Sequence, residues 1–283
     1  MDNALLFDNY KVEQTAYDEW VINKFEGVTY LYPKNTSSED KLDFYIEKNF
    51  IEKVLNLCQY INNIPCLENR VYIPTYEEIK SSFRHNEQQC YHAHECIKDE
   101  EFYFYKNKEA KDYINNTLLD IFNNYSFIPI DSVYKGYTMF IDRIITNFRI
   151  RCKKDSAFRK EPIFDNAIVP IGLLSHTLHQ LYCEFFPAED LQNPITNSYD
   201  ISITTQLTFD KKIWASTSTI SNMYEALKLY LINDKVNKNP LVKVCSYCDK
   251  MFVTQNAKKL RCSKDCTNRA NVKKNYYKKR TEE

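Results

Sequence analysis

Apolar residues recur every three or four positions along much of this chain, which is the spacing of amphipathic helices. Long stretches with this pattern are residues 41–62, 108–123, 131–151, 171–186 and 214–231, and a shorter one covers 76–84. Only three glycines and nine prolines interrupt the sequence, which favours long helices over tight turns. The pattern therefore predicts a mainly helical protein.

Two stretches instead have the character of β-strands. Residues 28–32 are mostly β-branched or aromatic and precede Pro33, which predicts a strand or an extended arm. Residues 199–209 are rich in β-branched side chains and largely alternate, which predicts a strand or a strand pair. The fold class we expect is therefore mainly α (α+β), a helical domain with a small β element.

A polar run at residues 232–240 ends on a proline and predicts a domain boundary. It divides the chain into a mainly helical domain of unknown role, residues 1–231, a linker, residues 232–241, and a C-terminal module, residues 242–283. A chain of 283 residues, 43% of them hydrophobic, is long enough to bury a large core.

The C-terminal module contains two close pairs of cysteines. Cys245 and Cys248 form a Cys-x-x-Cys pair, thirteen residues follow, and Cys262 and Cys266 form a Cys-x-x-x-Cys pair. Each pair can supply two thiolates from a tight turn, and four thiolates suit the tetrahedral coordination of zinc. The spacing predicts one structural Zn²⁺. Because four thiolates fill the tetrahedron, no position is left for a catalytic water.

Two other interpretations of these cysteines are a disulfide pair and four thiols that are buried close together by chance. Disulfides are rare in the reducing cytosol. The residues between the pairs are largely polar, which argues against burial. Zinc is therefore the favoured interpretation.

The residues around the cysteines also predict a local fold. We expect a zinc knuckle at residues 245–248, a strand from residue 251 to 253 and a return strand near residues 260–261. A helix should follow Ser263, whose hydroxyl can cap it, with Cys266 in its first turn. Knuckle, hairpin and helix together describe a treble-clef-like finger.

The last cysteine lies in the run Cys266-Thr267-Asn268-Arg269, and a basic, tyrosine-containing stretch follows at residues 273–280. On these residues the module resembles the CGNR zinc finger, a bacterial treble-clef-like finger named for its Cys-Gly-Asn-Arg run. Thr267 replaces the glycine, so the resemblance is to a divergent or sister family, and it covers about the last 40 residues. It implies a transcription regulator that binds DNA through this finger.

The charge of the chain is unevenly distributed. The totals of Lys+Arg and Asp+Glu are both 38, yet the C-terminal module has 12 basic against 4 acidic residues, leaving 26 against 34 before it. Four thiolates around Zn²⁺ contribute about −2, which does not reverse the positive charge of the module. A neutral total therefore conceals a basic module on an acidic body.

The basic residues of the module are the candidate nucleic-acid contacts. On a helix, Arg269 and Lys273 share a side with the last cysteines, whereas Lys274 and Lys278 lie opposite. Arg269 is therefore expected to contact either the thiolates and the hairpin or nucleic acid. The candidate contacts to phosphate are Arg269, Lys273, Lys274, Lys278, Lys279 and Arg280.

Three other clusters of candidate binding residues are less favoured. Cys90, His92, His94 and Cys96 alternate and could hold a second metal, but one continuous strand rarely surrounds a tetrahedral ion. Basic residues at positions 143–154 could form a groove for nucleic acid, but they lie towards and just past the C-terminal end of a predicted helix, where cations are ordinarily placed. His176 and His179 form a His-x-x-His pair with no third ligand at a recognised spacing.

The sequence also indicates what the protein does not do. Its N-terminus lacks the basic region of a secretory signal, and its longest apolar run, residues 167–174, is too short for a membrane span. We therefore expect a cytoplasmic protein with no membrane association. No set of acid, base and nucleophile can be assembled, so we do not expect an enzyme.

Two functions stay open. In the first, the C-terminal module binds nucleic acid, DNA being favoured by the family resemblance and RNA being an alternative. In the second, the module is a structural or docking element that contacts a protein partner or another copy of this chain.

Overall fold

The computed structural model describes residues 10–15, 19–25, 27–33, 41–44, 46–64, 107–125, 169–186, 203–210, 213–220, 223–237 and 241–281. These residues form five helices and nine short strands, which agrees with the expected mainly helical fold and small β element. The predicted helices at 76–84 and 131–151 lie outside the described residues, as do the basic residues between 143 and 154.

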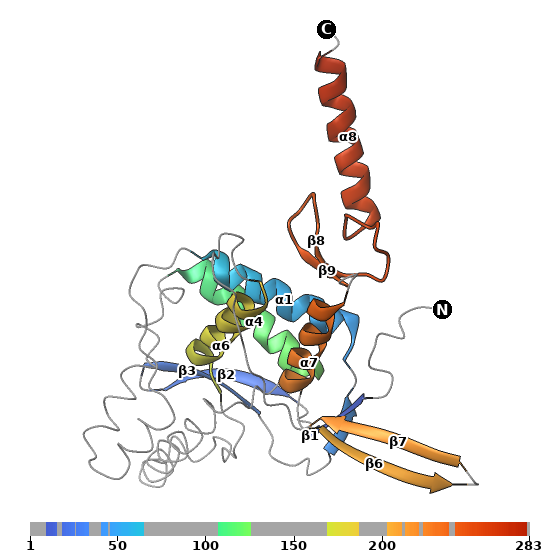
Figure 1. Cartoon of the computed structure of the whole chain (residues 1–283). Coiled ribbons are helices and arrows are strands. Elements are labelled where there is room, and N and C mark those ends of the chain that lie inside the picture. Colours follow the sequence, from blue (N-terminus) through green and yellow to red (C-terminus); the bar gives the residue numbers. More distant parts are fainter. Residues whose placement is uncertain are drawn as a thin grey trace, which may run out of the picture.

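Helix α1 (Lys48–Asn63) is the central helix of the body and contacts both α4 (Lys108–Tyr125) and α6 (Ile171–Phe185) (Figure 1). Its apolar positions are buried over much of its length, which lets it pack against two helices at once. The fourth helix of the body, α7 (Met223–Val236), contacts α6. The sequence-predicted helices at 108–123 and 171–186 are thus confirmed.

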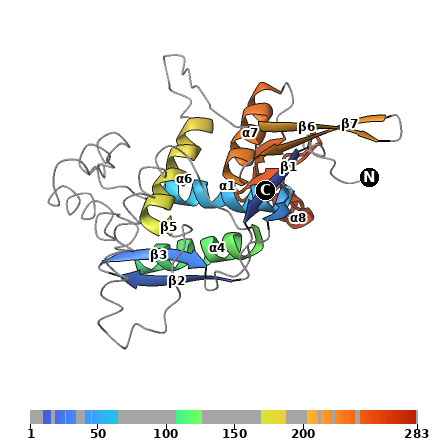
Figure 2. The same cartoon turned by 90° about the horizontal axis from the view of Figure 1, so that it is seen from below.

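Two sheets flank these helices. The first has the order β2 (Trp20–Phe25), β3 (Val28–Pro33), β5 (Val169–Pro170) and is antiparallel throughout. Figure 2 shows α4 lying along β2 and β3, and Trp20 of β2 packs edge-on against Phe122 of α4. The predicted strand at 28–32 is therefore confirmed. Gly27 supplies the positive φ of 86° at the turn before β3.

The second sheet has the order β4 (Lys41–Phe44), β1 (Tyr10–Thr15), β7 (Ile213–Ile220), β6 (Ile203–Asp210). Strand β1 runs parallel to β7, whereas the other pairs are antiparallel. Strands β6 and β7 pair over all eight of their residues and form a hairpin that projects from the body (Figure 1). They correspond to a strand pair that begins within the predicted 199–209.

Two sequence-based helix boundaries are wrong. Residues 41–44 are not helical: they pair with β1, and α1 begins only at Lys48. The helix predicted at 214–231 is also divided, because residues 213–220 form β7 and the helix begins at Met223. Strand β7 is extended because it is rich in β-branched side chains and pairs with β6. Ile220 is therefore buried at the end of a strand and not on a helix.

Helix α7 continues to Val236, so the first five residues of the predicted linker are helical. Asp234, in its last turn, is buried and accepts hydrogen bonds from the amides of Leu241 (2.5 Å) and Val242 (3.2 Å). This carboxylate therefore fixes the point at which the C-terminal module leaves the body. The division of the chain into two domains stays a prediction.

Candidate metal centre

Four cysteine sulfurs converge in the C-terminal module. All four lie within 4.8 Å of one another, with 3.7 Å between Cys248 and Cys262 and 3.5 Å between Cys262 and Cys266. In a tetrahedron with metal–sulfur bonds of about 2.3 Å, neighbouring sulfurs are roughly 3.8 Å apart. The four side chains that the spacing predicted are thus close enough together to hold one metal ion.

A tight turn positions the first pair of cysteines. Strand β8 (Val242–Val244) ends just before Cys245, whose amide donates a hydrogen bond to the carbonyl of Lys250 (2.9 Å). The amide of Asp249 donates to the carbonyl of Cys245 (3.0 Å), and Asp249 has a positive φ of 58°. Aspartate is among the few non-glycine residues that tolerate this conformation. The turn therefore carries Cys248 back toward Cys245.

The second pair of cysteines lies at the start of helix α8 (Lys264–Thr281). The hydroxyl oxygen of Ser263 accepts a hydrogen bond from the amide of Cys266 (3.1 Å), so the predicted cap is confirmed. The Thr267 hydroxyl donates to the carbonyl of Ser263 (3.0 Å). Thr267 is helical here, so the backbone does not require the glycine that the CGNR run has at this position.

The hairpin of the module differs from the predicted one. Strand β9 (Met251–Val253) is confirmed, but its partner is β8, upstream of the cysteines, and not residues 260–261. The carbonyl of Leu260 instead accepts a hydrogen bond from the amide of Ser246 (3.0 Å). The amide of Cys262 points at the sulfur of Cys245 (3.4 Å). These contacts join the two cysteine pairs directly.

Two of the thiols have very different pKa values. Burial acts to raise the pKa of Cys245, but amide hydrogen bonds from Cys262, Cys248 and Tyr247 outweigh it and lower that pKa to about 6. Burial, with hydrogen bonds shared among the sulfurs, raises the pKa of Cys262 to about 12. Cys245 therefore ionises at a lower pH than Cys262 in the metal-free cluster, and a bound metal has to displace the proton of Cys262.

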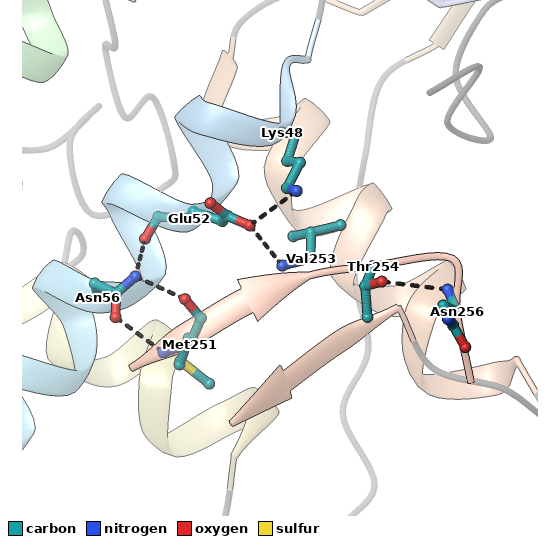
Figure 3. A network of polar contacts seen from close by, with 7 residues as sticks. All are labelled: Lys48, Glu52, Asn56, Met251, Val253, Thr254 and Asn256. Atoms are coloured by element: carbon teal, nitrogen blue, oxygen red, sulfur yellow. Dashed lines mark hydrogen bonds and ion pairs between the residues drawn. The ribbon is translucent and has the colours of Figure 1, made fainter. Parts of the chain in front are cut away.

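Side chains of α1 attach this module to the body (Figure 3). The Asn56 amide both accepts from the backbone N–H of Met251 (2.9 Å) and donates to its carbonyl (2.9 Å), as a neighbouring strand would. One turn earlier, the Glu52 carboxylate accepts from the amide of Val253 (2.8 Å) and lies 3.7 Å from the Lys48 ammonium. The open edge of β9 is thus covered by one face of α1.

Apolar contacts strengthen this attachment. Val242, Met251 and Val253 belong to the same buried cluster as the helices of the body. Gln59 adds a hydrogen bond from its amide to the carbonyl of Asp249, within the cysteine turn (2.9 Å). Glu52, Asn56 and Gln59 form the seam between α1 and the C-terminal module. The sequence did not predict this role, because polar residues on one side of a helix ordinarily face solvent.

Helix α8 leaves the metal centre and extends away from the body (Figure 1). Its 18 residues correspond to about 27 Å. Among the predicted nucleic-acid contacts, Arg269, Lys273 and Lys274 are exposed. Lys278, Lys279 and Arg280 lie in the last turns of the helix, beyond the residues whose side chains are described.

Arg261 supports the base of this helix and was missed by sequence reasoning. Its Nη1 donates to the carbonyl of Thr267 (3.5 Å) and to Oδ1 of Asn271 (3.4 Å). It thus joins the loop before Cys262 to α8, whereas the sequence suggested Arg269 for the contacts around the cysteines. The spacing of charges in the sequence does not indicate this role of Arg261, which follows from its position beside α8 in the fold.

The other candidate metal ligands form no comparable cluster among the described residues. His176 and His179 lie near each other on α6, and Nε2 of His179 is 3.6 Å from the sulfur of Cys183. Within the described ranges, however, the four cysteines are the only group of three or more potential ligands close enough to share an ion. The run from Cys90 to Cys96 lies outside those ranges.

Comparisons with known proteins were negative. No protein-family model, no curated protein and no solved structure matches this chain. Within the described part of the chain, no helix is long and apolar enough to cross a bilayer. The four-cysteine cluster is therefore the chemical feature on which a function can be based.

Proposed function

We propose that Cys245, Cys248, Cys262 and Cys266 hold one structural Zn²⁺ in a treble-clef-like finger. The proposal is supported by the sulfur separations and by an all-thiolate donor set, which zinc accepts in tetrahedral geometry. A cysteine turn, strand β9 and a helix that carries the last cysteine follow one another in the module, which supports such a finger although β9 pairs with β8. We also propose a distant relationship to the CGNR fingers, based on the run from Cys266 to Arg269.

We further propose that the protein is a transcription regulator that binds DNA through this finger. The observation that carries the proposal is α8 itself: it starts at the metal centre, extends into solvent and exposes Lys273 and Lys274. Together with the excess of basic residues in the module, this provides a positively charged helix that an acidic polymer can reach.

Binding of the zinc-loaded full chain to duplex DNA of random sequence tests the proposal. We expect an affinity that falls steeply as salt rises, because lysines displace counterions from phosphate. The Lys273→Gln/Lys274→Gln variant should bind more weakly and with a smaller salt slope. The Lys111→Gln variant, on α4 of the body, should change neither the affinity nor the slope. An absence of binding by the wild type at low salt would contradict the proposal.

A second function is favoured by a different observation. The seam between α1 and the C-terminal module uses three side chains of the body, Glu52, Asn56 and Gln59, which is what a structural or docking element requires. In this second function the module stabilises the body or presents a protein-binding surface, and chelation destabilises the protein with no nucleic-acid binding to lose.

RNA is the alternative partner of the nucleic-acid proposal. In the binding assay described for duplex DNA, a preference for single-stranded RNA would identify RNA as the partner.

A further inference from the structure

A pocket of about 630 Å³ opens beside the start of α8. Its lining comprises Lys258, Lys259, Leu260, Arg261, Ser263, Lys264, Thr267 and Asn268. Four of these residues are cationic, and none is acidic. The pocket is formed by the loop that leads to Cys262 and by the first turn of α8, so the metal centre holds its two walls together.

The loop that forms one wall is ordered by its own hydrogen bonds. Asn256 accepts from the amide of Lys258 through its side chain (3.0 Å) and from the amide of Lys259 through its backbone carbonyl (3.0 Å). The Lys259 ammonium lies 5.7 Å from the centre of the Phe252 ring. These contacts fix the backbone at both lysines and place the Lys259 ammonium before any ligand arrives, which reduces the entropy lost on binding.

Arg261 lies in the wall between the loop and the helix. Although its Nη1 is engaged by Thr267 and Asn271, its Nε is buried and has no hydrogen-bond acceptor among the residues that the structure describes. A buried donor without an acceptor is costly, and the guanidinium itself supplies one of the four positive charges of the lining. Guanidinium groups bind phosphate oxygens well because their donors form a planar fork.

The electrostatic environment of the pocket favours an anion. The first amides of the 18-residue helix α8 give its N-terminus a positive partial charge, which adds to the four cations. Opposing charge comes from Asp265 in the first turn and from about −2 on a zinc ion with four thiolates. The cations of the lining outnumber these negative charges.

From these observations we propose that the pocket binds backbone phosphate of a nucleic acid and anchors the start of α8 on it. The inference rests on the proposed nucleic-acid binding and adds a second contact region to Lys273 and Lys274. The rise along α8 from Lys264 to Lys274 is about 15 Å, comparable with the major-groove width of about 12 Å. The pocket and the exposed lysines can therefore reach phosphates on the two sides of one groove.

The test uses the zinc-loaded full chain and random-sequence duplex DNA at several salt concentrations. We expect Lys258→Gln/Lys259→Gln/Lys264→Gln to lose about tenfold or more in affinity at low salt and to reduce the salt slope by about one to two. The matched control is Lys250→Gln, an exposed lysine of the same module outside the pocket lining, which should leave the slope unchanged.

The outcomes separate this inference from the proposed function. If the wild type binds and the triple variant keeps the same slope while Lys273→Gln/Lys274→Gln reduces it, DNA binding stands and the pocket is not a contact. If the wild type binds no DNA, both proposals fall. Pocket-dependent binding of inorganic phosphate by a protein that does not bind DNA would indicate a small-anion site and would also overturn the inference.

Zinc content and thermal unfolding serve as the check on folding. The triple variant should retain both, because Lys258 and Lys264 are exposed. If loss of the Lys259 contact with Phe252 impairs folding, the Lys258→Gln/Lys264→Gln variant gives the same comparison with the contact intact.

Discussion

Asn56 shows how one side chain can replace a strand. Its amide satisfies both the N–H and the carbonyl of Met251, and its nitrogen also donates to the carbonyl of Glu52 (2.6 Å). Alanine at this position cannot satisfy either backbone group of β9. The backbone groups of a partly buried strand would then lose their partners, which costs more than the removal of an exposed hydrogen bond.

We therefore expect Asn56→Ala to lower the free energy of unfolding by about 1–3 kcal/mol. The control is Asn63→Ala, at the exposed C-terminal end of the same helix, which should change it by less than about 0.5 kcal/mol. Urea denaturation of both zinc-loaded variants measures the difference. Equal stability of the two variants would show that the seam contributes little.

Asp234 permits a paired test of a second contact. It is almost fully buried, and burial raises its pKa, although the amide hydrogen bonds from Leu241 and Val242 act in the opposite direction. Asp234→Ala should cost about 1–3 kcal/mol by leaving both amides without an acceptor. Asp234→Asn should be milder, because its side-chain oxygen can still accept and no charge is buried.

The raised pKa of Asp234 also predicts the pH dependence of this pair. A group whose folded-state pKa is raised contributes stability below its unfolded pKa and loses that contribution as pH rises through the folded value. Relative to wild type, Asp234→Asn should therefore become more favourable as pH increases from about 4 toward neutrality. Urea denaturation at several pH values gives the difference, and a trend in the opposite direction would contradict the raised pKa.

At the scale of elements, periodicity identified the helices better than it identified their ends. Helices α4 and α6 were predicted almost completely because their apolar residues face a core along their whole length. Residues 41–44 and 214–220 fall within predicted helices because apolar spacing continues across them. Pairing with β1 and with the neighbouring strand β6 determined their conformation, and strand pairing cannot be read from apolar spacing alone.

The cysteine site was predictable for the opposite reason. Four thiols at the spacing of Cys245, Cys248, Cys262 and Cys266 need only two tight turns to meet, and those turns are local in sequence. The residues that secure the site are less predictable. Arg261 and Asn56 act on backbone groups and have no motif of their own, so their roles follow only from the fold.

At the scale of the whole molecule, the metal centre and the helical core form one connected structure. Val242, Met251 and Val253 are buried with the body helices, while Asp249, in the cysteine turn, is bound by Gln59 of α1. Removal of the metal should therefore loosen part of the main core as well as the cysteine turn. Deleting the module would expose these same apolar contacts, which is why point variants are preferred to truncation.

We expect chelation of zinc to lower the melting temperature of the full chain by roughly 5 °C or more, because metal binding contributes to folding free energy. Added Zn²⁺ should restore the transition, and Mg²⁺ should not, since it prefers oxygen ligands. Calorimetry or circular dichroism gives the measurement. An unchanged transition after complete removal of the metal would show that the body is independent of the module.

The most direct test of the metal centre is the zinc content of the purified chain and of two cysteine variants. We predict about one zinc ion per chain in the wild type, a large loss in Cys248→Ser, and full content in Cys183→Ser, an exposed cysteine on α6 outside the cluster. A wild type that neither contains nor takes up zinc, or a Cys248→Ser variant that retains it fully, would contradict the metal centre from which the proposed functions follow.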